Sequence, residues 1–190
     1  MKLPWRVAAA NVDEDAYLVG EPTVAAVNVA LAKAYATAAE AHETIIAADT
    51  LVVVDSDILA KPQTTDEARA MLERLRNRAH HVLTGVVLQH ARRTWAGVVD
   101  TRVVMRNYSR AEAEDYIARG EPFDKAGGYA VQDQTFRPVD GLEGCYLNVV
   151  GLPLCAVAAG LNALGTEAQS AGAPPCAYCT AGEGLVRSGS

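Results

Sequence analysis

The hydrophobic pattern of the chain centres on Thr44–Val54, a nearly continuous apolar run that is interrupted by Asp49 and Thr50. A short run rich in isoleucine and valine predicts a strand buried on both faces, as in a sheet covered by helices. An ionised carboxylate in such a strand is costly unless it meets a partner, a metal or a cleft. Two interpretations of Asp49 therefore stay open. It is either a turn acid at a strand end or a catalytic carboxylate where the strand opens into a ligand crevice.

The segment before this run predicts a strand and a long helix. Alternating apolar residues between Leu3 and Val7 predict a short N-terminal strand. Pro22 then opens a helical pattern. The apolar residues of that pattern are spaced by three or four and predict its buried stripe: Val24, Val27, Leu31, Tyr35 and Ala38.

The segment after the run predicts further strands and helices. A hairpin turn is expected at residues 55–57, and two strands are expected over residues 81–89 and 94–105. Two Ser/Thr-x-x-Glu sequences predict capping boxes at helix starts: Thr64 with Glu67, and Ser109 with Glu112. His80 and His81 point to opposite faces of their strand and cannot easily share one metal ion, so structural or solvent-facing roles are favoured.

Length and composition predict one α/β domain of residues 1–165 followed by a flexible tail of residues 166–190, which has few large apolar residues. The net charge of −6 argues against polymeric nucleic acid as a partner. No apolar run approaches the length of a membrane span and no leader is evident, so we expect a cytoplasmic protein with no membrane partner. Cys176 and Cys179 supply half of a zinc site, which leaves two reduced thiols or a zinc shared across a dimer as alternatives.

Three lysines and two acids punctuate otherwise apolar or turn segments: Lys33, Lys61, Lys125, Glu14 and Asp49. Lysines neutralise phosphate oxygens, while a carboxylate activates water or helps to hold a divalent ion. This set of residue types suits a polyphosphate, provided that the fold brings the residues together. Gly127 and Gly128 follow Lys125 and allow a tight turn or a close approach to a ligand, which alone is a weak phosphate-loop signal.

Several blocks follow one another along the chain: Ala47–Val52, Lys61-Pro62, Glu67-Ala68, Thr84-Gly85, Lys125–Tyr129 with Gln132, and Val149–Leu154. In this order and spacing they resemble the Maf family of septum-formation-inhibitor-like nucleotide pyrophosphatases. The resemblance covers about residues 3–164. It implies an α/β fold with an elongated mixed sheet flanked by helices, two lobes and a central cleft. It also implies a house-cleaning enzyme that cleaves nucleoside triphosphates to the monophosphate and pyrophosphate with a divalent cation, Mg²⁺ or Mn²⁺, and that often forms a homodimer.

Carried over by position, the resemblance implies that Asp49 accepts the proton of the attacking water and that Glu14 is the second acid, both of them candidate metal ligands. Lys33, Lys61 and Lys125 are then the phosphate-binding cations. Thr50 and Gln132 match positions that separate family branches. Asp-Thr with Gln resembles the dTTP/UTP-hydrolysing branch, whereas Asp-Gln with a Glu is usual in the 7-methyl-GTP branch.

The resemblance has one departure. Family members begin with a strand and a Ser-x-Ser-Pro-Arg-Arg loop that holds the triphosphate, and this sequence starts after that point, with Arg6 in the wrong block to replace it. A start codon placed too far downstream and a degenerate paralogue both remain open as explanations. The alternative to an active pyrophosphatase is accordingly a catalytically impaired nucleotide-binding protein with a role in cell-division regulation.

Overall fold

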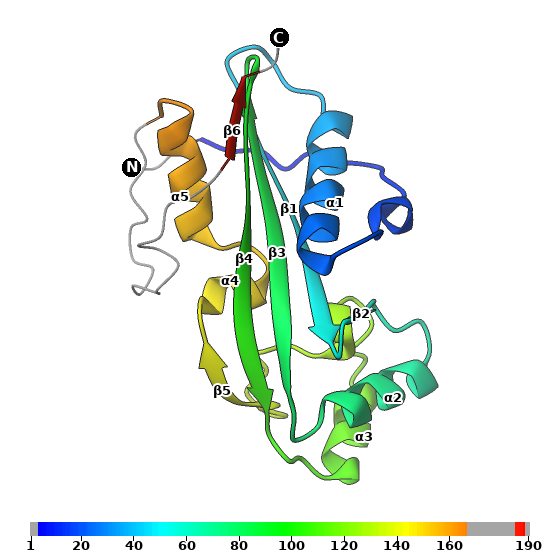
Figure 1. Ribbon diagram of the computed structural model, residues 1–190. Helices are drawn as coiled ribbons and strands as arrows, with labels where there is room; N and C mark the ends of the chain where they lie inside the picture. Colours follow the sequence, from blue (N-terminus) through cyan, green and yellow to red (C-terminus); the bar gives the residue numbers. More distant parts are fainter. Residues whose placement is uncertain (1–3, 167–184, 189–190) are drawn as a thin grey trace.

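The computed structural model describes residues 4–166 and 185–188 of the chain. A long antiparallel sheet in the order β2-β1-β3-β4-β5 runs through the molecule, and β6 pairs with β4 (Figure 1). The strands are β1 (Thr44–Val54), β2 (Asp57–Leu59), β3 (Ala79–His90), β4 (Arg93–Met105), β5 (Val139–Glu143) and β6 (Leu185–Ser188). The helices are α1 (Pro22–Ala36), α2 (Thr65–Leu75), α3 (Arg110–Ala118), α4 (Tyr146–Val150) and α5 (Leu154–Ala163), with 3₁₀ turns η1 (Glu14–Tyr17) and η2 (Ala126–Gly128).

The predicted α/β class, with helices flanking an elongated sheet, is confirmed. One detail differs, because all pairings between the described strands are antiparallel and the expected mixed sheet is not seen among them. The reason lies in the connections. β1–β2 and β3–β4 are tight hairpins, and Asp55 and Ser56 adopt positive φ angles of 52° and 71° in the predicted turn of the first.

The central strand β1 is covered unevenly along its length. Its pairing with β3 places Asp49 opposite Gly85 and Thr50 opposite Thr84. On its other edge, β2 pairs only with Val52–Val54. Among the described residues, no strand pairs with that edge from residue 44 to residue 51, so the middle of β1 borders open space.

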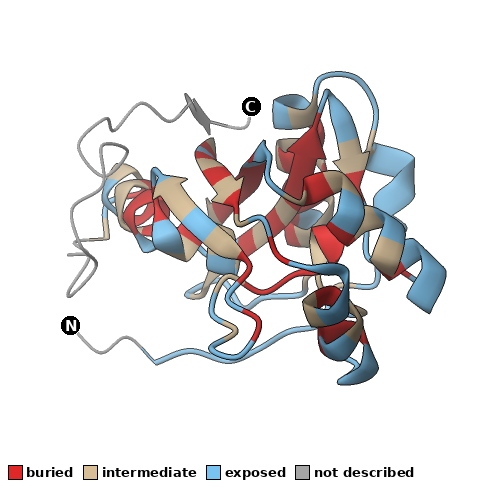
Figure 2. Ribbon diagram, turned by 90° about the horizontal axis from the view of Figure 1, so that it is seen from below, coloured by how far each residue is buried: buried red, intermediate tan, exposed pale blue. Residues whose placement is uncertain are grey.

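The helices form two groups along the sheet, with α1 and α5 towards one end and α2 and α3 at the other (Figure 1). Separate core clusters lie along the sheet, and α1 and α5 pack on different ones. Leu72, Tyr116 and Phe136 belong to the cluster beside α2 and α3, whereas Trp95 and Leu161 belong to the cluster beside α5. Buried residues follow the sheet and the helix faces turned towards it, while the outer helix faces are exposed (Figure 2).

The predicted buried stripe of α1 is wrong in part, because Val24 and Tyr35 are exposed. The buried face is made mainly of small residues: Ala25, Ala26, Val29, Ala30 and Ala34. The physical reason is a close approach between helix and sheet. A Cβ atom on Gly85 of β3 would lie 2.2 Å from the carbonyl oxygen of Ala26, which leaves no room for larger side chains on the inner face.

The predicted N-terminal strand is also wrong, because the described part of that segment, residues 4–13, forms no helix or strand. The side chains of Trp5 and Val7 are each 83% exposed, so their alternation has no buried face to serve. Arg6 instead binds the Glu43 carboxylate, with 2.7 Å between Nε and Oε1. The alternation of apolar residues in this segment therefore did not indicate a sheet strand.

The helix starts agree closely with the sequence. Ser109 and Glu112 form a complete capping box at α3. At α2 the Thr64 hydroxyl accepts from the Glu67 amide, while the Glu67 carboxylate accepts from Gln63 instead of from Thr64. Among the described residues, no helix has the length and apolar character needed to cross a membrane. Most of the predicted tail, including Cys176 and Cys179, lies outside the described residues.

Candidate active site

A cavity of about 720 Å³ lies beside the unpaired part of β1. Six of the seven site residues expected from the sequence line it: Glu14, Asp49, Thr50, Lys61, Lys125 and Gln132. The seventh, Lys33, contacts two of these residues. The fold therefore brings together segments that lie far apart in the sequence.

One side of the cavity holds a lysine between two acids. Lys33, in the last turn of α1, places its ammonium 2.7 Å from Asp49 Oδ1 and 2.8 Å from Glu14 Oε1. Burial opposes the charge on Lys33, but the hydrogen bonds to Asp49 and Glu14 outweigh it and raise the pKa of the lysine. Asp49 is only 9% exposed. Its carboxylate is tolerated in an apolar strand because it contacts the Lys33 ammonium and lines the cavity.

Thr50 points to the opposite face of the sheet from Asp49, because successive side chains alternate along a strand. Its hydroxyl lies 2.9 Å from the hydroxyl of Thr84, which in turn donates to the backbone carbonyl of Asn148 at 3.2 Å. Thr84 and Asn148 are both completely buried. No function was predicted for either residue. A polar residue inside an apolar strand, as Thr84 is in β3, is nevertheless the same signal that marked Asp49.

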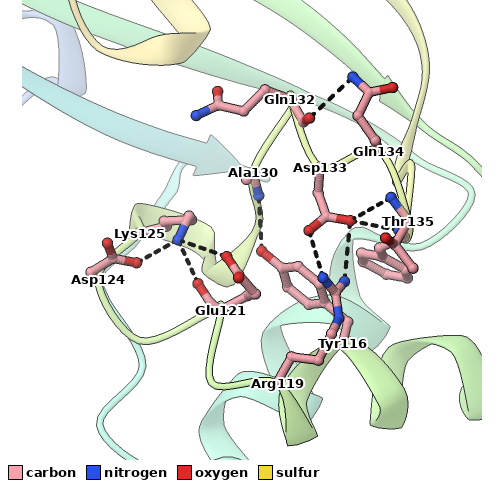
Figure 3. A network of polar contacts seen from close by, with 11 residues as sticks. Tyr116, Arg119, Glu121, Asp124, Lys125, Ala130, Gln132, Asp133, Gln134 and Thr135 are labelled. Atoms are coloured by element: carbon pink, nitrogen blue, oxygen red, sulfur yellow. Dashed lines mark hydrogen bonds and ion pairs between the residues drawn. The ribbon is translucent and has the colours of Figure 1, made fainter.

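Lys125 belongs to a loop on another side of the cavity and is held by its neighbours in the chain (Figure 3). Its ammonium donates to the Glu121 carbonyl at 2.7 Å and to Asp124 Oδ1 at 2.5 Å, and lies 3.6 Å from Glu121 Oε2. The hydrogen bond from Lys125 lowers the pKa of Asp124. A glycine is required two residues after Lys125, because Gly127 has a φ of 69° and a Cβ there would lie 2.9 Å from Val52 Cγ1 of β1.

Lys61 and Gln132 complete the lining of the cavity with groups that are not engaged elsewhere. Among the described residues, Lys61 has no salt-bridge partner, and the side-chain amide of Gln132 has no hydrogen-bond partner. The backbone carbonyl of Gln132 accepts from Gln134, and the adjacent Asp133 binds Arg119 through two contacts of 3.1 Å (Figure 3). The turn is thus fixed while the Gln132 amide is left available for a ligand.

A buried pair connects the glycine loop to the sheet. His80 of β3 lies 2.7 Å from the hydroxyl of Tyr129, which directly follows η2. Burial, with a smaller effect from neighbouring His81, lowers the pKa of His80 to about 4. Burial also raises the pKa of Tyr129. His81 is exposed and binds Asp100, so the structural and solvent-facing roles expected for the two histidines are confirmed.

Glu14 and Asp49 are the carboxylates of the site that a divalent cation would use. No group of three or more metal-binding side chains occurs among the described residues. Each of the two carboxylates directs one oxygen at the Lys33 ammonium, at 2.8 Å and 2.7 Å, and has a second oxygen outside that contact. Mg²⁺ is commonly bound by one or two carboxylates together with substrate phosphates.

Comparisons with known proteins identify a family and several relatives of this chain. A family model described as "Maf-like protein" matches residues 1–164. A dTTP/UTP pyrophosphatase of Thermomicrobium roseum is 50% identical over 128 residues, which cover 66% of this chain and 59% of that protein. One from a Geobacillus species is 42% identical over 153 residues, covering 80% and 82%. One from Dictyoglomus thermophilum is 46% identical over 123 residues, covering 64% of each. The chain thus spans less than two thirds of the length of the first and third of these relatives.

Proposed function

This chain belongs to the Maf family, and from that we propose that it hydrolyses dTTP and UTP, or modified pyrimidine triphosphates, to the monophosphate and pyrophosphate. The observation that carries the proposal is the shared cavity. A paired acid and lysine cluster lies in contact with it, and two further lysines line it. Relatives at 42% to 50% identity carry the name of this activity.

In the proposed reaction, Asp49 accepts a proton from water. The water oxygen attacks the α-phosphorus, the bond from that phosphorus to the bridging oxygen breaks, and pyrophosphate leaves. Lys33 orients the Asp49 carboxylate through a charge-assisted hydrogen bond of 2.7 Å. Lys61 and Lys125 bind phosphate oxygens and offset the charge of the triphosphate.

A divalent cation, Mg²⁺ or Mn²⁺, fits the acid pair, and Glu14 and Asp49 would hold it. When bound, such an ion neutralises charge on the phosphate oxygens. Glu14 takes part in the reaction as the second acid. A cytoplasmic location and a homodimer, both expected from the sequence, stay predictions and can be tested by fractionation and by light scattering.

The test is pyrophosphate release from dTTP and UTP in Mg²⁺ or Mn²⁺. We expect turnover by the unaltered protein and its loss in Asp49→Asn, which keeps the size of the side chain but removes the base. Asp100→Asn is the matched control, since Asp100 is exposed on β4 and binds His81. Full activity in Asp49→Asn would contradict the assigned role. Nucleotide binding by calorimetry without any pyrophosphate release would favour the impaired, regulatory alternative.

A further inference from the structure

We infer that Thr84 is a positioning residue that makes the Thr50 hydroxyl a hydrogen-bond acceptor towards the cavity, and that this selects bases carrying an N3–H group. Uracil and thymine carry that group, whereas cytosine has a lone pair at N3. The inference rests on the proposed function and adds to it a physical basis for discriminating among the pyrimidines.

The direction of the hydrogen bonds follows from their last member. The backbone carbonyl of Asn148 can only accept, so the contact of 3.2 Å from Thr84 uses the single hydroxyl proton of Thr84. The Thr84 oxygen can then only accept in its contact of 2.9 Å with Thr50, and Thr50 must donate there. The proton of Thr50 is thereby directed away from the cavity, and the lone pairs of the Thr50 oxygen are left to accept from a ligand.

The end of this chain of hydrogen bonds is firmly held. The Asn148 carbonyl also accepts from the Gly151 amide at 3.0 Å. The Asn148 side-chain amide donates to the Val82 carbonyl at 2.8 Å and to the Thr101 hydroxyl at 3.0 Å. Thr84 is 0% exposed, so water does not compete for its hydroxyl. The polarity of Thr50 is therefore set by the fold before any ligand binds.

The surroundings of Thr50 suit a nucleobase better than a phosphate. Thr50 and Asp49 leave the strand on opposite faces, so the hydroxyl lies away from the acid pair. The cavity lining contributed by α4 and the residue after it is uncharged: Val149, Val150 and Gly151. A Cβ on Gly151 would lie 3.8 Å from Thr50 Oγ1, which shows how closely this turn borders the hydroxyl.

An acceptor at this position favours one kind of base edge. The N3–H of uracil or thymine can donate to the Thr50 oxygen. A cytosine placed in the same way would bring its N3 lone pair against another lone pair and leave both unpaired. A site built to hydrogen-bond a ligand group discriminates strongly against an analogue that lacks the group.

The experiment compares kcat/KM for UTP and CTP in three variants of one scaffold. In Thr84→Val the Thr50 hydroxyl loses its acceptor and can rotate to donate to a ligand, while the Asn148 carbonyl keeps the Gly151 amide. We expect the ratio of UTP to CTP to fall by about tenfold or more, and Thr84→Ser to restore it. Thr44→Val is the control, because Thr44 lies on the same strand as Thr50, binds His90 and does not line the cavity. The ratio is insensitive to partial unfolding, since both substrates meet the same folded fraction.

Two further substrates separate the possible outcomes. 3-Methyl-UTP lacks the N3–H, so the unaltered protein should use it no better than CTP. An unchanged ratio in Thr84→Val, or efficient use of 3-methyl-UTP, would overturn the inference and leave the pyrophosphatase function intact. If the protein releases no pyrophosphate from any nucleotide, the proposed function fails. The inference is then decided by the relative calorimetric affinities of the α,β-imido analogues of UTP and CTP in the same variants.

Discussion

Two lysines at the same cavity are held by acids in different ways. Lys33 lies between Glu14 and Asp49, which come from η1 and β1 and meet only because the chain folds. Lys125 is held by Glu121 and Asp124, its near neighbours in sequence (Figure 3). The side chain of Asp124 is 80% exposed, whereas that of Asp49 is 9% exposed.

The Lys33 cluster is formed by tertiary contacts, whereas the Lys125 cluster is formed by residues close in sequence. The Lys33 cluster removes Asp49 almost completely from water, so it depends on the tertiary structure, and Asp49 cannot relax easily when the lysine is lost. The Lys125 cluster consists largely of contacts that are individually weak in water. In the proposed reaction, Lys125 would exchange its acids for a phosphate at little cost, while Lys33 would act on the acids themselves.

The strongest test of this contrast is Lys33→Met. Without the ammonium, Glu14 and Asp49 face each other without a shared cation, and we expect kcat/KM for dTTP to fall by about 10²–10³-fold. The free energy of unfolding should also fall, by about 1–3 kcal/mol, because the two carboxylates of a partly buried cluster lose their shared cation. Denaturant titration and pyrophosphate release measure the two effects. Thr23→Met, exposed on the same helix, is the control, and turnover within threefold of the unaltered protein would remove the distinction between the two lysines.

A lower pH should reduce the stability of the folded protein through His80, which contacts Tyr129 next to the Lys125 loop. His80 has a pKa of about 4 in the folded protein and about 6.5 when unfolded. Its contribution to stability is therefore complete above pH 6.5 and is lost as the pH falls towards 4, because only the unfolded chain takes up the proton in that range. Between pH 8 and pH 5 we expect a loss of about 2 kcal/mol from this group. His80→Gln should remove that part of the pH dependence measured by denaturant titration, while His81→Gln should retain it.

Lys125→Met should affect binding more than folding. The loss of one charge-assisted contact to a phosphate should raise KM about tenfold and change kcat little. The free energy of unfolding should stay within about 0.5 kcal/mol, since the acids that pair with Lys125 are exposed. Lys125→Arg keeps the charge and serves as the control. A loss of stability as large as that of Lys33→Met would mean that the two clusters are built alike.

The smallest expected effect belongs to Asp124→Asn. This change removes a carboxylate that competes with phosphate for Lys125, so KM should fall, by about two- to threefold, as expected for an exposed ion pair. The change should shrink as salt rises, because screening weakens the same competition. Steady-state kinetics at two ionic strengths measure it. A rise in KM would show that Asp124 holds Lys125 in its binding position instead of competing with the substrate.

Much of the fold could be predicted because its signals are local. The run of Ile and Val in β1, the hairpin at Asp55 and the cap at Ser109 depend on residues close in sequence, and the structure confirms each of them. The segment around Trp5 could not be predicted in this way. Alternation alone does not show whether a sheet edge and a core are available to bury one face.

The buried face of α1 was missed for a related reason. Spacing favoured Val24 and Tyr35, the larger apolar residues, but the helix lies so close to the sheet that alanines face inward. That choice is set by a partner element and is not visible in the helix itself.

In the candidate site, likewise, the sequence indicated which residues carry the chemistry but not which of them contact one another. Residue types indicated the acids and lysines. The fold places Glu14, Asp49, Lys61 and Lys125 on the lining of one cavity, and Lys33 in contact with the two acids. Their pairing could not be predicted, because it depends on how η1, α1 and β1 meet. No function was predicted for Thr84 or Asn148, because a hydroxyl and an amide inside the protein can be purely structural. Their significance comes from the direction of their hydrogen bonds, which only three-dimensional contacts reveal.

Gly85 has a consequence for the geometry of the acid pair. It lies directly across the ladder from Asp49, and the backbone of α1 rests against it where a methyl group would otherwise stand. The separation between helix and strand, and with it the reach of the Lys33 ammonium to the carboxylate, is thus determined by a missing carbon atom. Any other residue there would act as a spacer, lifting the helix from the sheet and disabling the site without altering a single charged group.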